Sequence, residues 1–265
     1  MLTKPLLLIT NKNNEEPKED IFLADYLSDF FDISLVDITD APTVLPNFKK
    51  CLIRNAWPSR LFAKEFDLIQ KIAKQNNIKL YNPGHRNFVE DKTYLVNLFE
   101  RNFPVIPTIN KLDNLQKLGS PDSYIIKPND GCSSMGVEEL SSKEIVQKDL
   151  SGYLIQPMIQ FKDEISFYYI DDIFVYAVVS AGPGKRWTLQ EYTPTEIELN
   201  WAKQFLDWNK LPYGLQRIDA CRLKNGKLFL MEIEDTFPML SLDMLSDETK
   251  EKVLACLVVS LEKNL

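Results

Sequence analysis

Acidic residues near the end of the chain have the types and spacing that would hold a cation. Two apolar runs flank Asn225-Gly226, which is the strongest short-range signal for a β-hairpin. A symmetric turn there pairs Asp219 with Glu232, and Arg217 with Glu234. Paired strand residues share one face, where like charges are destabilising, so we expect a positive ion among these acids. Carboxylate oxygens suit Mg²⁺, which binds few carboxylates and keeps phosphate or water ligands; a solvated sheet face is the alternative interpretation.

The opposite face of this hairpin is predicted to be apolar and to fix its register. A slip of one residue would bury the acids, because side chains alternate between the two faces of a strand. The predicted apolar set is Ile218, Ala220, Phe229, Met231 and Ile233.

Two lysines and a loop of small residues are typical of phosphate binding. Lys92 lies in the first turn of a helix expected over residues 91–101, where the helix dipole favours anions rather than a lysine. Lys127 precedes the Gly/Ser loop 128–136, whose backbone N–H groups could surround phosphate oxygens. The loop is not a P-loop, because Val137 follows it instead of Lys-Ser/Thr. A surface lysine and a simple turn are the alternatives.

Composition indicates a globular protein and excludes several classes. The 265 residues are 45% hydrophobic, which is enough for a substantial core. The net charge of −7 argues against nucleic acid or an anionic membrane as the main partner. The apolar runs are far shorter than the roughly 20 residues that span a bilayer, so no membrane segment is expected. Cysteines without a CxxC pattern indicate a reducing, cytoplasmic location; they are Cys51, Cys132, Cys221 and Cys256.

The elements that must position these residues divide into two predicted domains. Residues 1–84 alternate strand-like and helix-like segments, which favours a parallel sheet with crossover helices. A helix is expected over Lys18 to Asp32, and no GxGxxG dinucleotide motif follows any of the strands.

Residues 85–265 are predicted to form the second domain, with a nucleotide lid over 91–153 and a metal and catalytic part over 154–265. Its expected strands are residues 105–108, 123–127, 154–159, 163–170, 173–180 and the final hairpin. Helices are expected over 195–208 and after the cap Ser246. The fold class is mixed α/β (α+β).

In their order along the chain, these segments resemble the ATP-grasp superfamily, and the resemblance covers nearly the whole sequence. The segments are Lys92, Lys127-Pro128, Gln156-Pro157-Met158-Ile159, Glu164-Ile165-Ser166, Arg217-Ile218-Asp219 and Glu232-Ile233-Glu234 with Pro238. The spacing from Asp219 to Glu232 is similar to that in D-alanyl-D-alanine ligases. Most of the superfamily has Glu-x-Asn where this chain has Glu-x-Glu, as the cycloserine-forming ligase and glutathione-synthetase-like proteins do. The resemblance implies a pre-ATP-grasp, Rossmann-like domain followed by an ATP-grasp domain.

The resemblance also implies roles for individual residues. Lys92, Lys127 and the loop residues Ser133 and Ser134 would contact the ATP phosphates. Gln156 and Met158 would meet the adenine through backbone groups, and Glu164 would bind the ribose. The metal ligands would be Asp219, Glu232 and Glu234, holding Mg²⁺ or, alternatively, Mn²⁺. Arg217 and Arg186 would face the reacting carboxylate.

The implied activity is ATP-dependent ligation of a carboxylate to an amine-type acceptor through an acyl phosphate, on a small molecule or peptide. A kinase-like phosphotransferase and a non-catalytic nucleotide-binding protein are the alternatives. No general base is evident, and His85, the one histidine, is interpreted as a structural or substrate-pocket residue. The sequence does not reveal the substrates, and the oligomeric state stays open, with a homodimer as one outcome.

Overall fold

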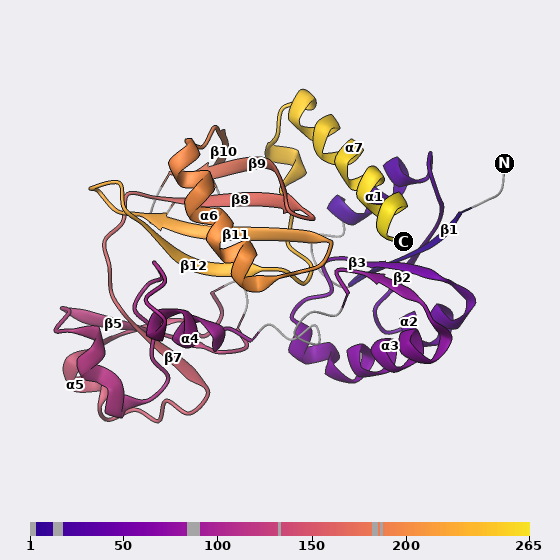
Figure 1. The fold of residues 1–265 in the computed structure, drawn as a ribbon. Helices are drawn as coiled ribbons and strands as arrows, with labels where there is room; N and C mark the ends of the chain where they lie inside the picture. Colours follow the sequence, from indigo (N-terminus) through magenta and orange to yellow (C-terminus); the bar gives the residue numbers. More distant parts are fainter. Residues whose placement is uncertain (1–3, 13–17, 84–90, 132–133, 182–184, 186–187) are drawn as a thin grey trace.

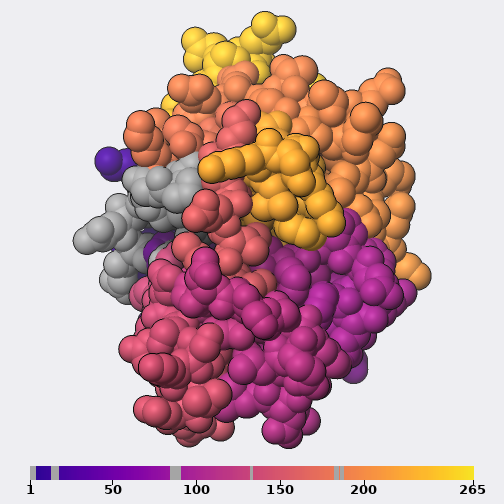
Figure 2. Space-filling view, turned by 90° about the vertical axis from the view of Figure 1, so that its left-hand side faces the viewer, coloured from indigo at the N-terminus to yellow at the C-terminus, as the bar shows by residue number. Residues whose placement is uncertain are grey.

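The computed structural model describes residues 4–12, 18–83, 91–131, 134–181, 185 and 188–265, which form three sheets (Figure 1). One sheet is parallel and the other two are antiparallel. In the side view of Figure 2, the magenta and pink residues from the middle of the chain lie beneath the orange residues that follow them. In the described part of the chain, no helix is long and apolar enough to cross a membrane.

The first sheet is parallel, as the alternation of strands and helices predicts. Its strands have the order β2-β1-β3-β4. They are β1 (Pro5–Thr10), β2 (Asp32–Asp37), β3 (Lys50–Ile53) and β4 (Lys79–Tyr81). The helical segments here are α1 (Lys18–Leu27), α2 (Ala41–Val44), η1 (Leu45–Asn47), η2 (Ser59–Phe62) and α3 (Ala63–Asn76). The central strand β1 is buried on both faces, which explains its continuous apolar run.

Helix α1 is shorter than expected, and its buried face includes an acid. It ends at Leu27 instead of Asp32, because a turn leads directly into β2. Its buried residues are Asp20, Leu23 and Leu27, whereas Ile21 is 53% exposed. An acid therefore faces the core, and its partners must come from elsewhere in the chain.

The second, three-stranded sheet has the order β6-β5-β7. Its strands are β5 (Ser123–Pro128), β6 (Glu138–Ser141) and β7 (Tyr153–Pro157), and its helices are α4 (Tyr94–Glu100), η4 (Leu112–Leu118) and α5 (Ser142–Ile145). The expected strand 105–108 is wrong, since only isolated bridges form at Val105 and Ile109. The predicted subdomain boundary after residue 153 falls at the start of β7, which pairs with β5.

The large sheet has the order β10-β9-β8-β11-β12 and packs between two helices. Its strands are β8 (Asp163–Ile170), β9 (Ile173–Ser180), β10 (Leu189–Tyr192), β11 (Leu215–Arg222) and β12 (Leu228–Glu234). Helix α6 (Glu196–Asn209) packs on one face with Ile218 and Ala220. After η5 (Leu242–Met244), helix α7 (Asp247–Asn264) covers part of the other face and lies beside α1 (Figure 1).

A β-bulge corrects the predicted apolar face of the final hairpin. Asp219 pairs with Glu232, but Ala220 pairs with Leu230, so Met231 is the extra residue. Nearer the turn the alternation is therefore reversed: Leu228 and Leu230 are buried while Phe229 and Met231 are only partly buried. The predicted core positions of Phe229 and Met231 are wrong, whereas those of Ile218, Ala220 and Ile233 are confirmed.

Candidate active site

Alternation along β11 and β12 brings the acids and the arginine to one face of the large sheet. The register places Glu232 opposite Asp219 and Glu234 opposite Arg217, which confirms the predicted pairing. On the other side of β11, strand β8 places Ser166 opposite Asp219. The site is therefore built on three neighbouring strands, which hold side chains more rigidly than a loop would.

The guanidinium of Arg217 is fixed from several sides. Its Nε and Nη2 atoms each donate to the Asp219 carboxylate at 2.8 Å. Its Nη2 atom lies 3.8 Å from Glu234 Oε1, and the guanidinium lies 5.9 Å from the centroid of the Tyr168 ring. The Ser166 hydroxyl also donates to Asp219 Oδ1, at 2.7 Å. The two hydrogen bonds from Arg217 to Asp219 have the fork-like geometry in which arginine binds carboxylates most strongly.

Electrostatics confirm that the charged groups share one environment. Burial, followed by the charge of Glu232, raises the pKa of Glu234 to about 8, with Asp219 adding to the effect. Arg217 and Lys92 oppose this rise. A further cation would stabilise the ionised form of an acid in such surroundings, as the pairing of acids in the sequence predicts.

Lys92 links the acids to the Gly/Ser loop. Its ammonium forms an ion pair with Glu232 and donates to the Gly131 carbonyl at 2.5 Å. Its backbone N–H donates to the Asn129 carbonyl at 2.8 Å, and the residue is buried. The lysine thus lies between the loop and β12, and its contact with phosphate stays a prediction.

The carboxylate oxygens of these acids are the ligand type that a hard cation prefers, although the side chains do not already surround a metal position. Among the residues that the structure describes, no three His, Cys, Asp or Glu side chains converge as a metal site. Asp219 is turned toward Arg217, and Glu232 toward Lys92. Directly paired strand residues have Cβ atoms roughly 5 Å apart, and a carboxylate has about four acceptor positions. Both carboxylates can therefore accept Mg²⁺ as well, and their role as ligands, with Glu234, stays a prediction.

Lys127 and Glu164 approach the same face from two different sheets. Lys127 lies in β5, and Glu164 lies in β8 opposite Cys221. Burial raises the pKa of Cys221 to about 12, with the Glu164 carboxylate adding to the rise and the Lys127 ammonium opposing it. Glu164 therefore lies beside Cys221, on the side of the large sheet that also carries Asp219, and the charge of Lys127 acts on the same place.

The expected adenine hinge lies at the end of β7. The Gln156 side chain is buried and donates to Thr108 Oγ1 at 2.8 Å, so it holds the hinge against the neighbouring segment. The backbone N–H of Met158 donates to the Ser123 carbonyl at 2.9 Å, and its side chain is exposed. The Met158 N–H is thus already engaged within the sheet, which does not fit the predicted contact of this backbone group with adenine.

The Gly/Ser loop is described only in part. Ser134 is exposed and has a φ of 60°, and Gly136 has a φ of 75°. A Cβ atom at Gly136 would lie 2.8 Å from the Pro128 ring, so the loop needs glycine there. The predicted residues Ser133 and Arg186, and also His85 and Cys132, lie outside the described residues.

The structure adds Ser180, which the sequence analysis missed. Ser180 ends β9 directly opposite Glu164, and it is buried. Within the described ranges its hydroxyl has no hydrogen-bond partner. A buried polar atom without a partner is costly, so the Ser180 hydroxyl is suited to a ligand beside Glu164. The tight turn at residues 171–172 does not identify this residue by itself, because a register shift between β8 and β9 moves the partner of Glu164 from Val179 to Ser180.

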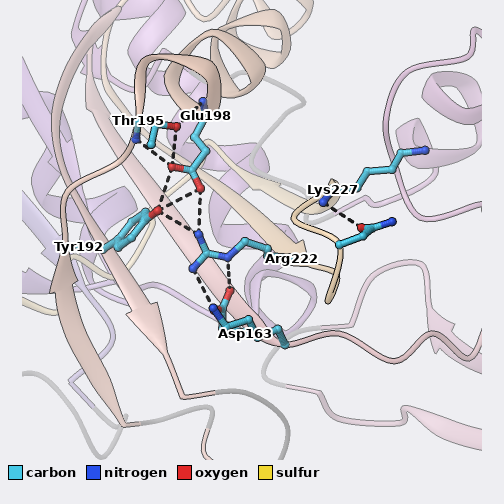
Figure 3. Close-up of polar contacts among 8 residues, drawn as sticks. Asp163, Tyr192, Thr195, Glu198, Arg222 and Lys227 are labelled. Atoms are coloured by element: carbon cyan, nitrogen blue, oxygen red, sulfur yellow. Dashed lines mark hydrogen bonds and ion pairs between the residues drawn. The ribbon is translucent and has the colours of Figure 1, made fainter.

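Arg222 belongs to a separate network on the opposite face of β11 (Figure 3). Its Nε and Nη2 atoms donate to the two Asp163 oxygens, each at 2.9 Å, and its Nη1 atom donates to Glu198 Oε1 at 3.0 Å. Tyr192 and Thr195 complete the hydrogen bonds of Glu198. This network ties β10 and the start of α6 to β8 and β11, and all its charges are paired.

Comparison with solved structures identifies the fold. The chain is similar to D-cycloserine synthetase, with a TM-score of 0.75 and 20% identity over 97% of this chain and 99% of that chain. It is similar to D-alanine–D-alanine ligase from Bacillus anthracis complexed with ATP, with a TM-score of 0.72 and 15% identity over 98% of each chain. It is also similar to an ATP-grasp ligase complexed with a minimal precursor, with a TM-score of 0.68 and 11% identity over 99% of each chain. No family model and no curated protein matches the sequence. The chain has the ATP-grasp fold, as its order of motifs predicts.

Proposed function

We propose that this protein is an ATP- and Mg²⁺-dependent ligase that joins a carboxylate to an amine-type acceptor. The observation that carries the proposal is the convergence of Lys92, Arg217, Asp219, Glu232 and Glu234 on one face of the large sheet, in a chain with the ATP-grasp fold. Two cations and three acids at one place match a reaction in which negative groups must be brought together.

The nucleotide would lie between the three-stranded sheet and the large sheet. Lys127 and Lys92 would bind its phosphates, with Ser133 and Ser134 of the loop closing over them. Glu164 would accept from the ribose hydroxyls, and the Ser180 hydroxyl beside it would make a second contact. Gln156 and Met158 would border the adenine. This arrangement is supported by the charges of Lys127 and Glu164, which both act on Cys221, and by the unpaired Ser180 hydroxyl.

Asp219, Glu232 and Glu234 would hold Mg²⁺. The ion would supply positive charge to the phosphate oxygens and so lower the cost of bringing an anion toward them. Lys92 forms an ion pair with Glu232 in this structure. Its ammonium would therefore bind phosphate oxygens next to the metal ion.

The protein's residues would align the substrate carboxylate for attack on the γ-phosphorus of ATP. A carboxylate oxygen forms the new bond to phosphorus, the bond to the β,γ-bridging oxygen breaks, and ADP leaves with an acyl phosphate as the other product. Arg217 would stabilise the charge of the incoming carboxylate. The amine then attacks the acyl carbon and expels phosphate, and its proton passes to phosphate or water. Arg186 is proposed to assist Arg217.

The substrate class is proposed as a small molecule or a peptide with a free carboxylate. Solved structures with the same fold include enzymes named for cycloserine and D-alanine and a ligase complexed with a precursor. These names suggest the compounds to try first: D-alanine and other amino acids as acids and acceptors, and peptides with a free carboxylate.

The experiment is a coupled assay for ADP and phosphate with panels of acids and acceptors. The proposal predicts that both products appear together only when an acid and an acceptor are present, and that Glu232→Gln abolishes the reaction. Glu248→Gln, an exposed acid in the first turn of α7, is the matched control and should be fully active. A stable phosphorylated product without free phosphate would instead identify a phosphotransferase.

A further inference from the structure

The segment from Pro238 to Leu242, which follows β12 and its acids, is held by side chains from several elements. We call it the 238–242 segment. The Pro238 carbonyl accepts from Arg54 Nη1 at 2.7 Å, and the Leu240 carbonyl accepts from the Tyr176 hydroxyl. Such a set of directional bonds fixes the path of a backbone that has no regular structure of its own.

Glu19, from α1, holds the same segment by its backbone N–H groups. Its Oε1 atom accepts from the Leu240 N–H at 2.9 Å, and its Oε2 atom accepts from the Leu242 N–H at 3.3 Å. Arg54 Nη2 donates to Glu19 Oε1 at 2.7 Å, so the two side chains bind each other as well as the segment. The first sheet and its helix thus reach across to the chain that follows the proposed metal ligands.

The Arg54 guanidinium is completely buried, with 0% of its side chain exposed, which excludes a direct contact with substrate. It lies 3.5 Å from Asp20 Oδ1 as well as beside Glu19. Buried ion pairs are weak contributors to stability, since apolar residues of similar size often serve as well. Their advantage is direction, because a guanidinium fork fixes a carbonyl and a carboxylate in one geometry.

The 238–242 segment in turn contacts Arg217. The Met239 carbonyl accepts from Arg217 Nη1 at 3.3 Å, while the other guanidinium nitrogens bind Asp219. The Tyr168 ring beside Arg217 is hydrogen-bonded through its hydroxyl to Ser241. The segment therefore contacts Arg217 directly through the Met239 carbonyl, and indirectly through Ser241 and the Tyr168 ring.

We propose that Arg54 is a positioning residue for Arg217: paired with Glu19, it holds the 238–242 segment in the place that aims the Arg217 guanidinium. The inference rests on the proposed function, in which Arg217 binds the reacting carboxylate. The buried charges of Arg54 and Glu19 then serve to align the site that contains Arg217. Loss of alignment by about 1 Å costs on the order of 100-fold in rate, which sets the scale of the expected effect.

The test compares Arg54→Lys and Arg54→Met with Tyr81→Phe. The control removes another buried bond between the first domain and the rest of the chain, from the Tyr81 hydroxyl to Ser260 Oγ at 2.6 Å, which lies outside the 238–242 segment. Both Arg54 variants should lower kcat by about 10-fold to 100-fold and leave the dissociation constant of ATP unchanged. Tyr81→Phe should lower Tm by about as much as the Arg54 variants do, but it should leave kcat unchanged. Equal loss of kcat in Tyr81→Phe would overturn the proposal.

The double variant Arg54→Met/Glu19→Met separates alignment from folding. Removing both charges leaves neither one buried alone, and Asp20, which also faces Arg54, is protonated at pH 5. The Tm measured at pH 5 should therefore recover toward the wild-type value while kcat stays low. Recovery of kcat together with Tm would show that the pair only stabilises the fold, and would contradict the proposal.

A readout independent of turnover distinguishes failure of this inference from failure of the proposed function. The Nε–H resonance of Arg217, assigned by its absence in Arg217→Lys, should shift in Arg54→Met and in the double variant but not in Tyr81→Phe. An unmoved resonance overturns the positioning role even if the ligase activity is found. A moved resonance supports the role even if the wild-type protein turns over none of the acids and acceptors tried.

Discussion

The buried acid of helix α1 makes the stability of the protein depend on pH in a way that one substitution can remove. Asp20 is completely buried beside Arg54, Glu19, Thr10 and Asn55. Burial raises the pKa of its carboxyl from 3.8 to about 6, although Arg54 and hydrogen bonds from Thr10 and Asn55 oppose the rise. With Asp20 protonated, the cluster contains one arginine and one ionised glutamate, so it is neutral.

The sign and size of the effect follow from linkage. Because the folded state keeps its proton up to about pH 6, the stability that protonation provides is complete below pH 3.8 and is lost as the pH rises to 6. At roughly 1.4 kcal/mol for each pH unit, the loss is about 3 kcal/mol. Asp20→Asn stays neutral at every pH, so its stability relative to wild type should rise by about 2 kcal/mol between pH 4 and pH 7.

The assay is urea unfolding of both proteins at several pH values between 4 and 8, followed by circular dichroism. Asp25→Asn, which changes an exposed acid of the same helix, is the control and should track wild type throughout. A difference in stability between Asp20→Asn and wild type that stays constant with pH, or that favours wild type as the pH rises, would show that Asp20 does not carry this pH dependence.

Three further substitutions test individual contacts. Lys127→Ala should weaken ATP binding about 10-fold to 100-fold in calorimetry, because it removes a charged phosphate contact, and unaltered affinity would count against the phosphate role. Ser180→Ala should weaken ATP binding about five-fold without lowering Tm, since the hydroxyl has no partner in the described part of the protein; unchanged affinity would assign it to packing. Ile233→Asp should lower the free energy of unfolding by more than about 4 kcal/mol, because it buries an unpaired charge, while Ile233→Val should cost only about 1 kcal/mol; a stable aspartate variant would contradict the buried position of Ile233.

Local patterns in the sequence were sufficient for the hairpin that carries the acids. The Asn225-Gly226 turn predicted the pairing of Asp219 with Glu232 and of Arg217 with Glu234, and the structure has both pairs. This pairing survives because Ile218 and Ile233 both face the core. Turn chemistry and alternation act over a few residues, so they can be read without knowledge of the rest of the fold.

Contacts between distant segments could not be read in this way. The bulge at Met231 accompanies hydrogen bonds between Leu230 and the segment at Pro104 and Ile106, far away in sequence. Asp20 faces the core because Arg54 and Asn55 approach it from the end of another strand. In both cases a partner from elsewhere in the chain overrides the local pattern of apolar residues.

Calorimetric titration with a non-hydrolysable ATP analogue, with and without Mg²⁺, tests most directly whether the acids of the hairpin bind Mg²⁺ together with the nucleotide. We expect one nucleotide per chain, bound much more tightly with Mg²⁺ in wild type and in Glu248→Gln, and a loss of this metal dependence in Glu232→Gln. Absence of nucleotide binding, or binding of equal strength in all three proteins with and without Mg²⁺, would contradict the proposed site for Mg²⁺ and ATP.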